Sequence, residues 1–397
     1  MQTEPVYAGR WLILVLALAC GAAVANIYFP QAVTPLIARG LHVSPGSAAQ
    51  VVTATQFGYA VGIFLLVPLG DRLVHRRLLA VLFAIVGLGL LVAGAAPTLP
   101  ALVAGSLVVG ATTVVPQIII PMAAGMVAPQ RRAAVTGTLL SGLIGGILLA
   151  RAFGGFAGEW LGWRAPYFIA AGLALVLAIV LFAVVPQTVP PSRQRYGSLL
   201  ASSLRLLRTE PELRRSCLYQ AAAFAGFNAA WTSIVLLVTG PRYGFGTSVV
   251  GLIALVSAAT MLCTPIVGRV IDRWGPDVVT TVSIPGVALS AGVLAFGALG
   301  GAAGIAALTI GMLVLDVAMQ SGQVANQARV FSIHPEMRSR LNTAYMTCVF
   351  LGGSAGSWLG VRAYFTFGWA GVCVLVAGLA VVAFARHFVH LLMARSR

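Results

Sequence analysis

The sequence Pro68-Leu69-Gly70-Asp71-Arg72 has a second copy half a chain later, in Gly268-Arg269-Val270-Ile271-Asp272-Arg273-Trp274-Gly275. Asp71 and Asp272 are 201 residues apart, and beyond them further matches continue at a constant offset of 206 residues. These matches pair Gln117 with Gln323, Pro129 with Pro335, Arg132 with Arg338, and Gly146 with Gly352. Solenoid repeats are only about 20–50 residues long, so this period predicts two similar halves.

Composition places both halves in a lipid bilayer. Hydrophobic residues make up 59% of the chain and charged residues 9%, with a mean hydropathy of +0.96. Apolar runs of about 18 residues or more can cross a membrane as helices. Duplicated bundles of such helices are typical of secondary transporters, whose substrate site lies between the halves. We predict an all-α membrane protein with twelve transmembrane helices, at residues 11–36, 48–69, 78–96, 101–127, 133–157, 165–186, 217–239, 247–267, 278–298, 303–327, 342–363 and 368–388.

The charge distribution predicts the orientation of the chain. All 25 cations are arginine, and the formal net charge is +16. If the N-terminus is cytoplasmic, twenty arginines fall in cytoplasmic segments, four fall in outer loops and Arg151 falls within a span. Cytoplasmic loops are enriched in Lys and Arg, so both termini are expected to be cytoplasmic. The positive charge then reports topology, and no nucleic-acid partner is expected.

A polar connector separates two groups of six spans. It divides the chain into an N-terminal bundle at 1–190, a cytoplasmic connector at 191–211 and a C-terminal bundle at 212–397. Leucines in the connector fit either a short amphipathic helix on the membrane surface or a solvated linker. The first span begins like a signal peptide, but cleavage there would break the duplication, so we expect an uncleaved helix.

Missing residue patterns exclude several classes of function. A P-loop needs a lysine and the chain has none, so ATP is not an expected partner. The sequence has no H-E-x-x-H or G-x-S-x-G motif and no pair of carboxylates within one span, so no enzyme is expected. Five scattered cysteines, and His387 with His390, lack the neighbours that a metal site needs, so no metal is expected.

Several motifs resemble the major facilitator superfamily. Its signature between spans two and three is similar to residues 67–76, with a partial second copy at 268–275. Val67 and Val74 stand where that family prefers glycine. The fifth span, with Gly142 and Gly146, resembles the antiporter-type signature, although Ala150-Arg151 replaces the expected Gly-Pro. Other stretches resemble a bacterial efflux-type branch: Ala25–Gln31, Leu148–Arg151 and Ser339–Thr343.

The resemblance covers the whole chain and implies the fold of that superfamily, two pseudo-symmetric six-helix bundles that work by alternating access. It also implies a carrier in a bacterial inner membrane that is usually driven by protons. No cofactor is then expected, because the proton gradient supplies the energy. The expected partners are a small-molecule substrate, protons and the lipid bilayer, and the expected state is a monomer.

Arg151 and Asp316 are the two charges that lie well inside predicted spans. A charge in hydrocarbon costs at least ~2.5–3.5 kcal/mol, so each should face protein or a water-filled cavity. At the 206-residue offset their counterparts are Ser357 and Gly110, so neither charge belongs to the duplicated scaffold. We interpret both as proton-coupling residues, with Glu159 or an aspartate at the cytoplasmic edge as the alternative.

Two polar stripes are expected to line a cavity between the halves. Asp316 shares one helical face with glutamines at +4, +7 and +11, and a face of span seven mixes aromatic rings with amides. Helix packing and hydrogen bonds between helices would produce similar stripes. With polar residues from spans one and four, the candidate substrate-binding residues are Asn26, Tyr28, Gln31, Gln117, Gln220, Phe224, Asn228, Trp231, Gln320, Gln323 and Gln327.

Two further features concern motion between the halves. By resemblance, Asp71 acts as a conformational latch that accepts hydrogen bonds from the start of span eleven near Asn342. Arg72, Asp272 and Arg273 complete the expected latch motifs. Glycines in spans five and eleven predict close helix contacts, which we expect at the sliding interface of the bundles; they are Gly142, Gly146, Gly154, Gly352, Gly353 and Gly356.

Together these features predict a secondary active transporter that exports a small organic molecule or drug in exchange for protons. A proton symporter for metabolite uptake is the alternative within transport. A transport-inactive membrane sensor or scaffold is the alternative from a different class, but it would not need two polar stripes and a membrane carboxylate.

Overall fold

The computed structural model describes residues 9–187, 194–257, 259–260, 263–334 and 337–395. Every regular element in these ranges is a helix. Helices are the expected solution for so apolar a chain, because a helix satisfies its backbone hydrogen bonds internally where no water is present. Residues 191–193, at the start of the expected connector, and Arg397 lie outside the described ranges.

The N-terminal bundle supplies the first six spans. Span four is divided at Thr113 and Val114, where the Thr113 hydroxyl donates a hydrogen bond to the carbonyl of Ala23 at 2.9 Å. Its elements are α1 (Arg10–Gly40), α2 (Pro45–Ala48), α3 (Gln50–Leu66), η1 (Val67–Asp71), α4 (His75–Ala95), α5 (Leu99–Thr112), α6 (Val115–Gly125), α7 (Pro129–Leu161) and α8 (Ala165–Val184).

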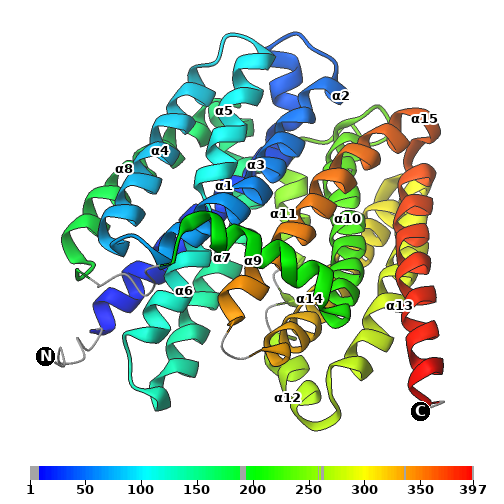
Figure 1. The fold of residues 1–397 in the computed structure, drawn as a ribbon. Coiled ribbons are helices and arrows are strands. Elements are labelled where there is room, and N and C mark those ends of the chain that lie inside the picture. Colours follow the sequence, from blue (N-terminus) through cyan, green and yellow to red (C-terminus); the bar gives the residue numbers. More distant parts are fainter. Residues whose placement is uncertain (1–8, 188–193, 258, 261–262, 335–336, 396–397) are drawn as a thin grey trace, which may run out of the picture.

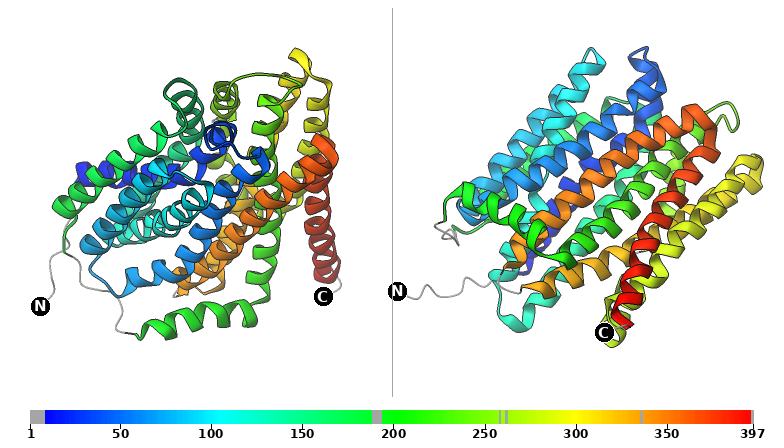
Figure 2. Two further views of the ribbon diagram at one scale, coloured as in Figure 1. Left: turned by 90° about the horizontal axis from the view of Figure 1, so that it is seen from above. Right: turned by 45° about the vertical axis from the view of Figure 1, so that its right-hand side comes forward.

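The C-terminal bundle follows the connector helix α9 (Tyr196–Thr209). Span eight is divided between α11 and α12. The last two spans, together labelled α15, are two helices joined by a sharp bend at Gly368, where the backbone leaves the helical conformation with a φ of 66° (Figure 2). The elements are α10 (Pro211–Thr239), α11 (Thr247–Ser257), α12 (Thr264–Trp274), α13 (Pro276–Ala295), η3 (Phe296–Leu299), α14 (Gly301–Ile333) and α15 (Arg338–Arg395). The predicted fold of twelve spans in two bundles is therefore confirmed.

The molecule has two distinct ends. The start of α1 and the end of α15 lie in the lower half of Figure 1, and α2 lies near the top. We call the end that carries the α6–α7 and α12–α13 turns the connector end, and the opposite end, with α2 and the α10–α11 loop, the distal end. Helix α9 belongs to the connector end, because its Tyr196 hydroxyl donates to the carbonyl of Leu65 at 2.6 Å. Of the two connector structures considered, the amphipathic helix is the one present, with Leu199 and Leu206 buried.

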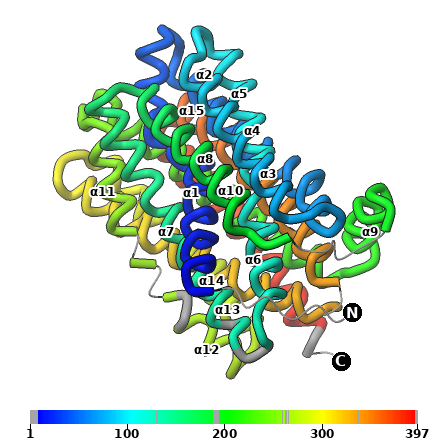
Figure 3. The backbone as a smooth tube through the Cα atoms, turned by 90° about the vertical axis from the view of Figure 1, so that its left-hand side faces the viewer, coloured from blue at the N-terminus to red at the C-terminus, as the bar shows by residue number. Residues whose placement is uncertain are grey.

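Glycines bring one pair of helices into close contact inside each bundle, α1 with α7 and α10 with α15. A methyl group added to Gly146 of α7 would lie 2.2 Å from the carbonyl oxygen of Gly21 in α1, and Figure 3 shows these helices side by side. Gly356 of α15 meets Ala225 of α10 in the same way, at 2.1 Å. The expectation that these glycines lie at the sliding interface was wrong, because each set packs within its own bundle.

The bundles meet each other at the distal end. The Thr53 hydroxyl in α3 lies 3.4 Å from that of Ser357 in α15, and the Ser354 hydroxyl donates to the Thr53 carbonyl at 3.2 Å. On the other side, the Glu159 carboxylate of α7 accepts a hydrogen bond from the backbone N–H of Ser248 at 2.7 Å. This carboxylate caps the start of α11, where the helix dipole favours an anion. These contacts close the distal end.

Candidate functional site

A central cavity lies between the bundles and is closed toward the distal end. Its volume is about 160 Å³, and helices of both halves line it. Arg151 and Asp316 at its closed end are 1% and 4% exposed, whereas the lining glutamines Gln320, Gln323 and Gln327, which follow along the same helix toward the connector end, are partly exposed. The cavity is therefore accessible from the connector end. Side chains that line it include Tyr28, Tyr59, Gln117, Leu140, Ile144, Arg151, Phe224, Phe227, Asp316, Gln320, Gln323, Gln327 and Phe350.

The polar stripe of α14 faces this cavity. Asp316 and the three glutamines that follow it on the same helical face all contribute to the cavity wall. The glutamines are partly exposed, so their amides are available to a solute. Gln327, nearest the connector end, also donates to the Asn342 side chain of α15 at 3.4 Å.

Helix α10 divides its candidates between the cavity and the bundle interior. Phe224 lines the cavity and stacks on Phe227, with ring centroids 5.6 Å apart. Gln220 instead points into the C-terminal bundle, where its amide lies 3.4 Å from the carbonyl of Met319. Gln220 also accepts a hydrogen bond from Asn326 at 3.3 Å, so its role is helix packing.

Helices α1 and α6 show a similar division. Tyr28 lines the cavity, whereas Asn26 turns toward Thr113 inside the N-terminal bundle, 3.4 Å away. Gln117 lines the cavity and accepts a hydrogen bond from Asn342 across the bundles at 3.1 Å. Gln117 also lies 3.4 Å from the hydroxyl of Tyr59, a lining residue that the sequence analysis missed.

Arg151 projects from α7 into a cage of aromatic rings. Its guanidinium carbon lies 4.1 Å from the ring centroid of Trp231, 4.8 Å from that of Tyr28 and 5.3 Å from that of Phe227. Its Nε donates to Gln31 at 2.8 Å. Cation–π contacts strengthen in a desolvated site, so the cage stabilises a buried positive charge.

Asp316 is held from the other bundle by the same indole. Trp231 donates from Nε1 to the Asp316 carboxylate at 3.0 Å. Among the described residues, Asp316 forms no ion pair with an N···O distance of 4.0 Å or less. Trp231 thus contacts Arg151 through its face and Asp316 through its edge.

Asn228 joins the two bundles beside this group. Its side-chain oxygen accepts hydrogen bonds from Gln31 of α1, at 3.1 Å, and from Gln56 of α3. Its own amide donates to the carbonyl of Phe224 at 2.9 Å. All three amide side chains are buried, so a set of hydrogen bonds inside the protein spans the bundle boundary.

The expected latch residues lie at the connector end. Asp71 is half-buried, and Arg340 of α15 interacts with it electrostatically across the bundles. Arg72 and Asp272 are exposed, and the guanidinium of Arg273 lies 5.3 Å from the ring centroid of Trp274.

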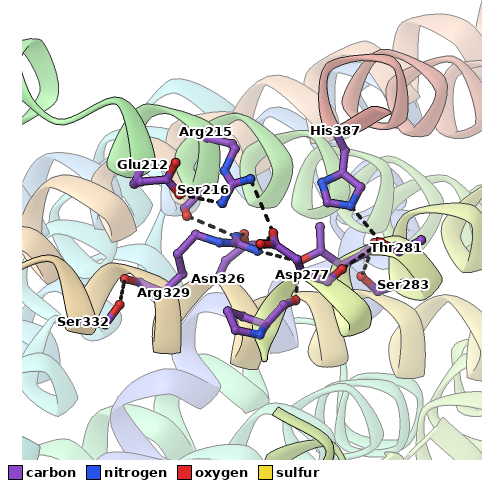
Figure 4. Close-up of polar contacts among 12 residues, drawn as sticks. Glu212, Arg215, Ser216, Asp277, Thr281, Ser283, Asn326, Arg329, Ser332 and His387 are labelled. Carbon is purple, nitrogen blue, oxygen red and sulfur yellow. Dashed lines mark hydrogen bonds and ion pairs between the residues drawn. The ribbon is translucent and has the colours of Figure 1, made fainter. Parts of the chain in front are cut away.

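The structure also shows a charged cluster that the sequence analysis did not find (Figure 4). Arg329 of α14 donates to Asp277 of α13 at 2.8 Å and to Asn326 at 2.6 Å, while Arg215 of α10 lies 3.4 Å from Asp277. Nearby, His387 of α15 hydrogen-bonds Thr281 at 2.9 Å. The cluster ties together the connector ends of three helices. The predicted spans stop short of these charges, and their partners in other helices lie 49 or more residues away along the chain, so no local pattern connects them.

Two six-helix bundles around a central cavity define a membrane carrier, and comparison with known proteins identifies its family. The profile of the Major Facilitator Superfamily matches residues 14–357. The chain is 36% identical over 371 residues to Uncharacterized transporter YgaY of Escherichia coli O157:H7, across 94% of this chain and 93% of that protein. It is 34% identical over 375 residues to Probable transporter SCO4007 of Streptomyces coelicolor (strain ATCC BAA-471 / A3(2) / M145), across 94% and 85% of the two chains.

A solved structure shows the same fold. The crystal structure of the nucleoside transporter NupG superimposes with a TM-score of 0.74 at 16% identity, covering 95% of this chain and 98% of that one. The chain therefore belongs to the major facilitator superfamily and is a multi-pass membrane protein that transports small molecules.

Proposed function

We propose that this protein is a proton-coupled antiporter that exports a small organic molecule. The observation that carries the proposal is the position of Asp316, a buried carboxylate in the wall of the central cavity. A proton-driven carrier needs a group that gains and loses a proton in each cycle, and this carboxylate lies where the substrate binds. Arg151 supports the role, because a neighbouring positive charge favours the ionised carboxylate.

The location of the carboxylate favours exchange over symport. Asp316 has one oxygen bonded to Trp231, and its Oδ2 atom has no hydrogen-bond partner among the described residues. A substrate bound at this oxygen and a proton bound at the same oxygen exclude each other. Competition for a single group couples the exit of one species to the entry of the other.

We further propose that the connector end faces the cytoplasm of a bacterial inner membrane. Twenty of the 25 arginines fall on that side, and the relatives named above are bacterial. The cavity then opens inward and can load substrate from the cytoplasm. In this proposal the proton gradient is the energy source, no cofactor takes part and a monomer is sufficient.

The latch remains part of the proposal. Asp71 lies at the connector end of the N-terminal bundle and Arg340 at the start of α15 in the other bundle. Their attraction would strengthen as the connector ends approach and would stabilise the state that opens to the distal end. In the same proposal Arg72, Asp272 and Arg273 belong to the loop motifs at that end.

The experiment uses purified protein in liposomes with a pH-sensitive dye inside and a panel of small organic solutes outside. For the wild type, we expect an imposed proton gradient to drive an exported solute across the membrane in the direction opposite to the flow of protons. Asp316→Asn should abolish concentrative transport and retain energy-independent exchange, whereas Glu210→Gln, which changes a partly exposed carboxylate next to the connector helix, should behave as wild type. Concentrative transport by Asp316→Asn would contradict the coupling role, and co-directional flux of solute and protons would identify an uptake symporter.

A further inference from the structure

The closed end of the cavity carries two buried charged groups, and each has an atom that is shielded from solvent and lacks a hydrogen-bond partner among the described residues, so a ligand reaches these atoms only when the side chains shift. Arg151 uses Nε to contact Gln31, and its Nη2 atom has no hydrogen-bond partner among the described residues. Asp316 uses Oδ1 to contact Trp231, and its Oδ2 atom has no hydrogen-bond partner within 3.5 Å in the described ranges, although the Ser257 hydroxyl lies close enough to interact with this carboxylate. Both side chains line the cavity, one from each bundle.

These two charges attract each other electrostatically but are not among the ion pairs within 4.0 Å of the described residues. The Trp231 indole is bound by both, with its ring face 4.1 Å from the guanidinium carbon and its Nε1 atom 3.0 Å from the carboxylate. Trp231 is fully buried, so it acts as a rigid spacer between the positive and the negative group. A buried charged atom without a partner costs free energy, and a ligand that supplies the missing partner recovers it.

The surroundings restrict the kind of ligand further. Rings of Tyr28, Phe227 and Phe224 lie beside the two charges, and the cavity of about 160 Å³ is small. Aromatic walls favour a flat or apolar body, and the small volume favours a compact molecule. A singly charged ligand would satisfy one of the two groups and leave the other without a partner.

We propose that the substrate is a compact dipolar molecule, with an acidic group that binds Arg151 and an ammonium group that binds Asp316. This inference rests on the proposed function and names the substrate class of the same site. The acidic group accepts hydrogen bonds from the guanidinium, and the ammonium donates to the carboxylate. The ammonium also displaces the proton from Asp316, so the same contact accounts for recognition and for exchange. Because the two groups come from different bundles, the ligand bridges them.

The test compares zwitterions with their singly charged counterparts on the wild-type protein in lipid nanodiscs. One set is 4-(aminomethyl)benzoate with 4-methylbenzoate and 4-methylbenzylamine. The second set is L-phenylalanine with 3-phenylpropanoate and phenethylamine, which tests a shorter separation of the charges. By calorimetry, we expect at least one zwitterion to bind at least about tenfold more tightly than both of its counterparts, since each charge-assisted contact contributes that much.

Variants assign each end of the ligand. Arg151→Gln should reduce the affinity of the preferred zwitterion to that of its amine counterpart, and Asp316→Asn should reduce it to that of its acid counterpart. Arg164→Gln, a control at the distal end, should leave the affinities for the preferred zwitterion and for its two counterparts unchanged. The wild-type comparison does not depend on whether the variants fold.

The inference is wrong if neither zwitterion binds more tightly than its counterparts, or if a singly charged probe binds equally well. These binding measurements need no gradient, so they separate the inference from the proposed function. Concentrative export of a solute that is not dipolar would overturn the inference and leave the antiporter proposal standing. Tight binding of a zwitterion without any flux would support the inference about the substrate and contradict the antiporter proposal.

Discussion

At the scale of single residues, the site and the contact between the bundles are made by the same side chains. Arg151 and Gln31 belong to the N-terminal bundle, whereas Trp231 and Asn228 belong to the C-terminal bundle. Each of these residues contacts at least one partner in the opposite bundle. A ligand that rearranges Arg151 therefore acts directly on the hydrogen bonds that hold the bundles together.

Asn228 gives the first prediction. Asn228→Ala removes the acceptor shared by Gln31 and Gln56 and leaves two buried donors without a partner, each costing about 1–3 kcal/mol. The distal contact should open more often. In a cysteine-free background, a cysteine at Thr53 should then react faster with a water-soluble maleimide.

The control for this variant is Asn26→Ala. Asn26 is equally buried, and its hydrogen bond to Thr113 lies within the N-terminal bundle. We expect Asn26→Ala to lower the thermal midpoint without changing the labelling rate at position 53. Equal labelling rates in Asn228→Ala and the parent protein would show that the hydrogen bonds of Asn228 do not hold the distal end closed.

At the scale of helices, α14 connects the site to the connector end. Asp316 and its glutamines form one face, and Asn326 and Arg329 anchor the same helix to α10 and α13. A helix held at several points transmits a displacement of its cavity face as a rigid element. We therefore expect the charged cluster of Figure 4 to make the C-terminal bundle move as a unit.

The second prediction concerns this cluster. Asp277→Asn leaves Arg215 and Arg329, whose side chains are 4% and 5% exposed, without their shared carboxylate. Asp277 itself is 43% exposed, so solvent screening limits the loss to about 1–3 kcal/mol. The thermal midpoint in detergent should fall by several degrees. Asp272→Asn, an exposed carboxylate at the end of α12, should leave it unchanged, and an equal fall in both variants would contradict the role of the cluster.

Periodicity in the sequence predicted which residues share one face of a helix. It could not predict the direction of a side chain whose hydrogen-bond partner lies far away along the chain. The spacing of Asp316 and its glutamines placed all four on one face, and the structure puts that face on the cavity. Spacing also grouped Gln220 with Phe224, but Gln220 has its partner inside the bundle. Its rotation away from the cavity follows from Asn326, which no local pattern connects to it.

Distance along the chain explains the other differences. The whole fold followed from apolar runs and the duplication, because each span is a local feature. The contact of Trp231 with Arg151, and the burial of Thr247 against Gly155, join segments far apart in sequence. Such contacts depend on how helices pack, so one sequence without structure cannot place them.

At the scale of the whole molecule, the third prediction tests orientation. In a cysteine-free background, Thr98→Cys in the α4–α5 loop at the distal end should react with an impermeant maleimide added outside intact cells. Ser198→Cys in α9 should react only after the membrane is opened. Both native side chains are exposed in the structure, so accessibility does not limit either reaction. Labelling of position 198 from outside would reverse the proposed orientation.

The last prediction tests whether the distal contact opens during transport. The hydroxyls of Thr53 in the N-terminal bundle and Ser357 in the C-terminal bundle are 3.4 Å apart, so a pair of cysteines at these positions should form a disulfide on oxidation. A carrier that alternates between two openings must separate these residues in each cycle, so the disulfide should stop exchange in liposomes and a reductant should restore it. Cysteines at Thr232 and Ser357 provide the control, because these hydroxyls are 3.1 Å apart within a single bundle and their disulfide should leave exchange intact. Continued exchange by the oxidised Thr53–Ser357 pair would mean that the bundles do not part at the distal end, and the substrate would then have to leave by a route other than the one between α3 and α15.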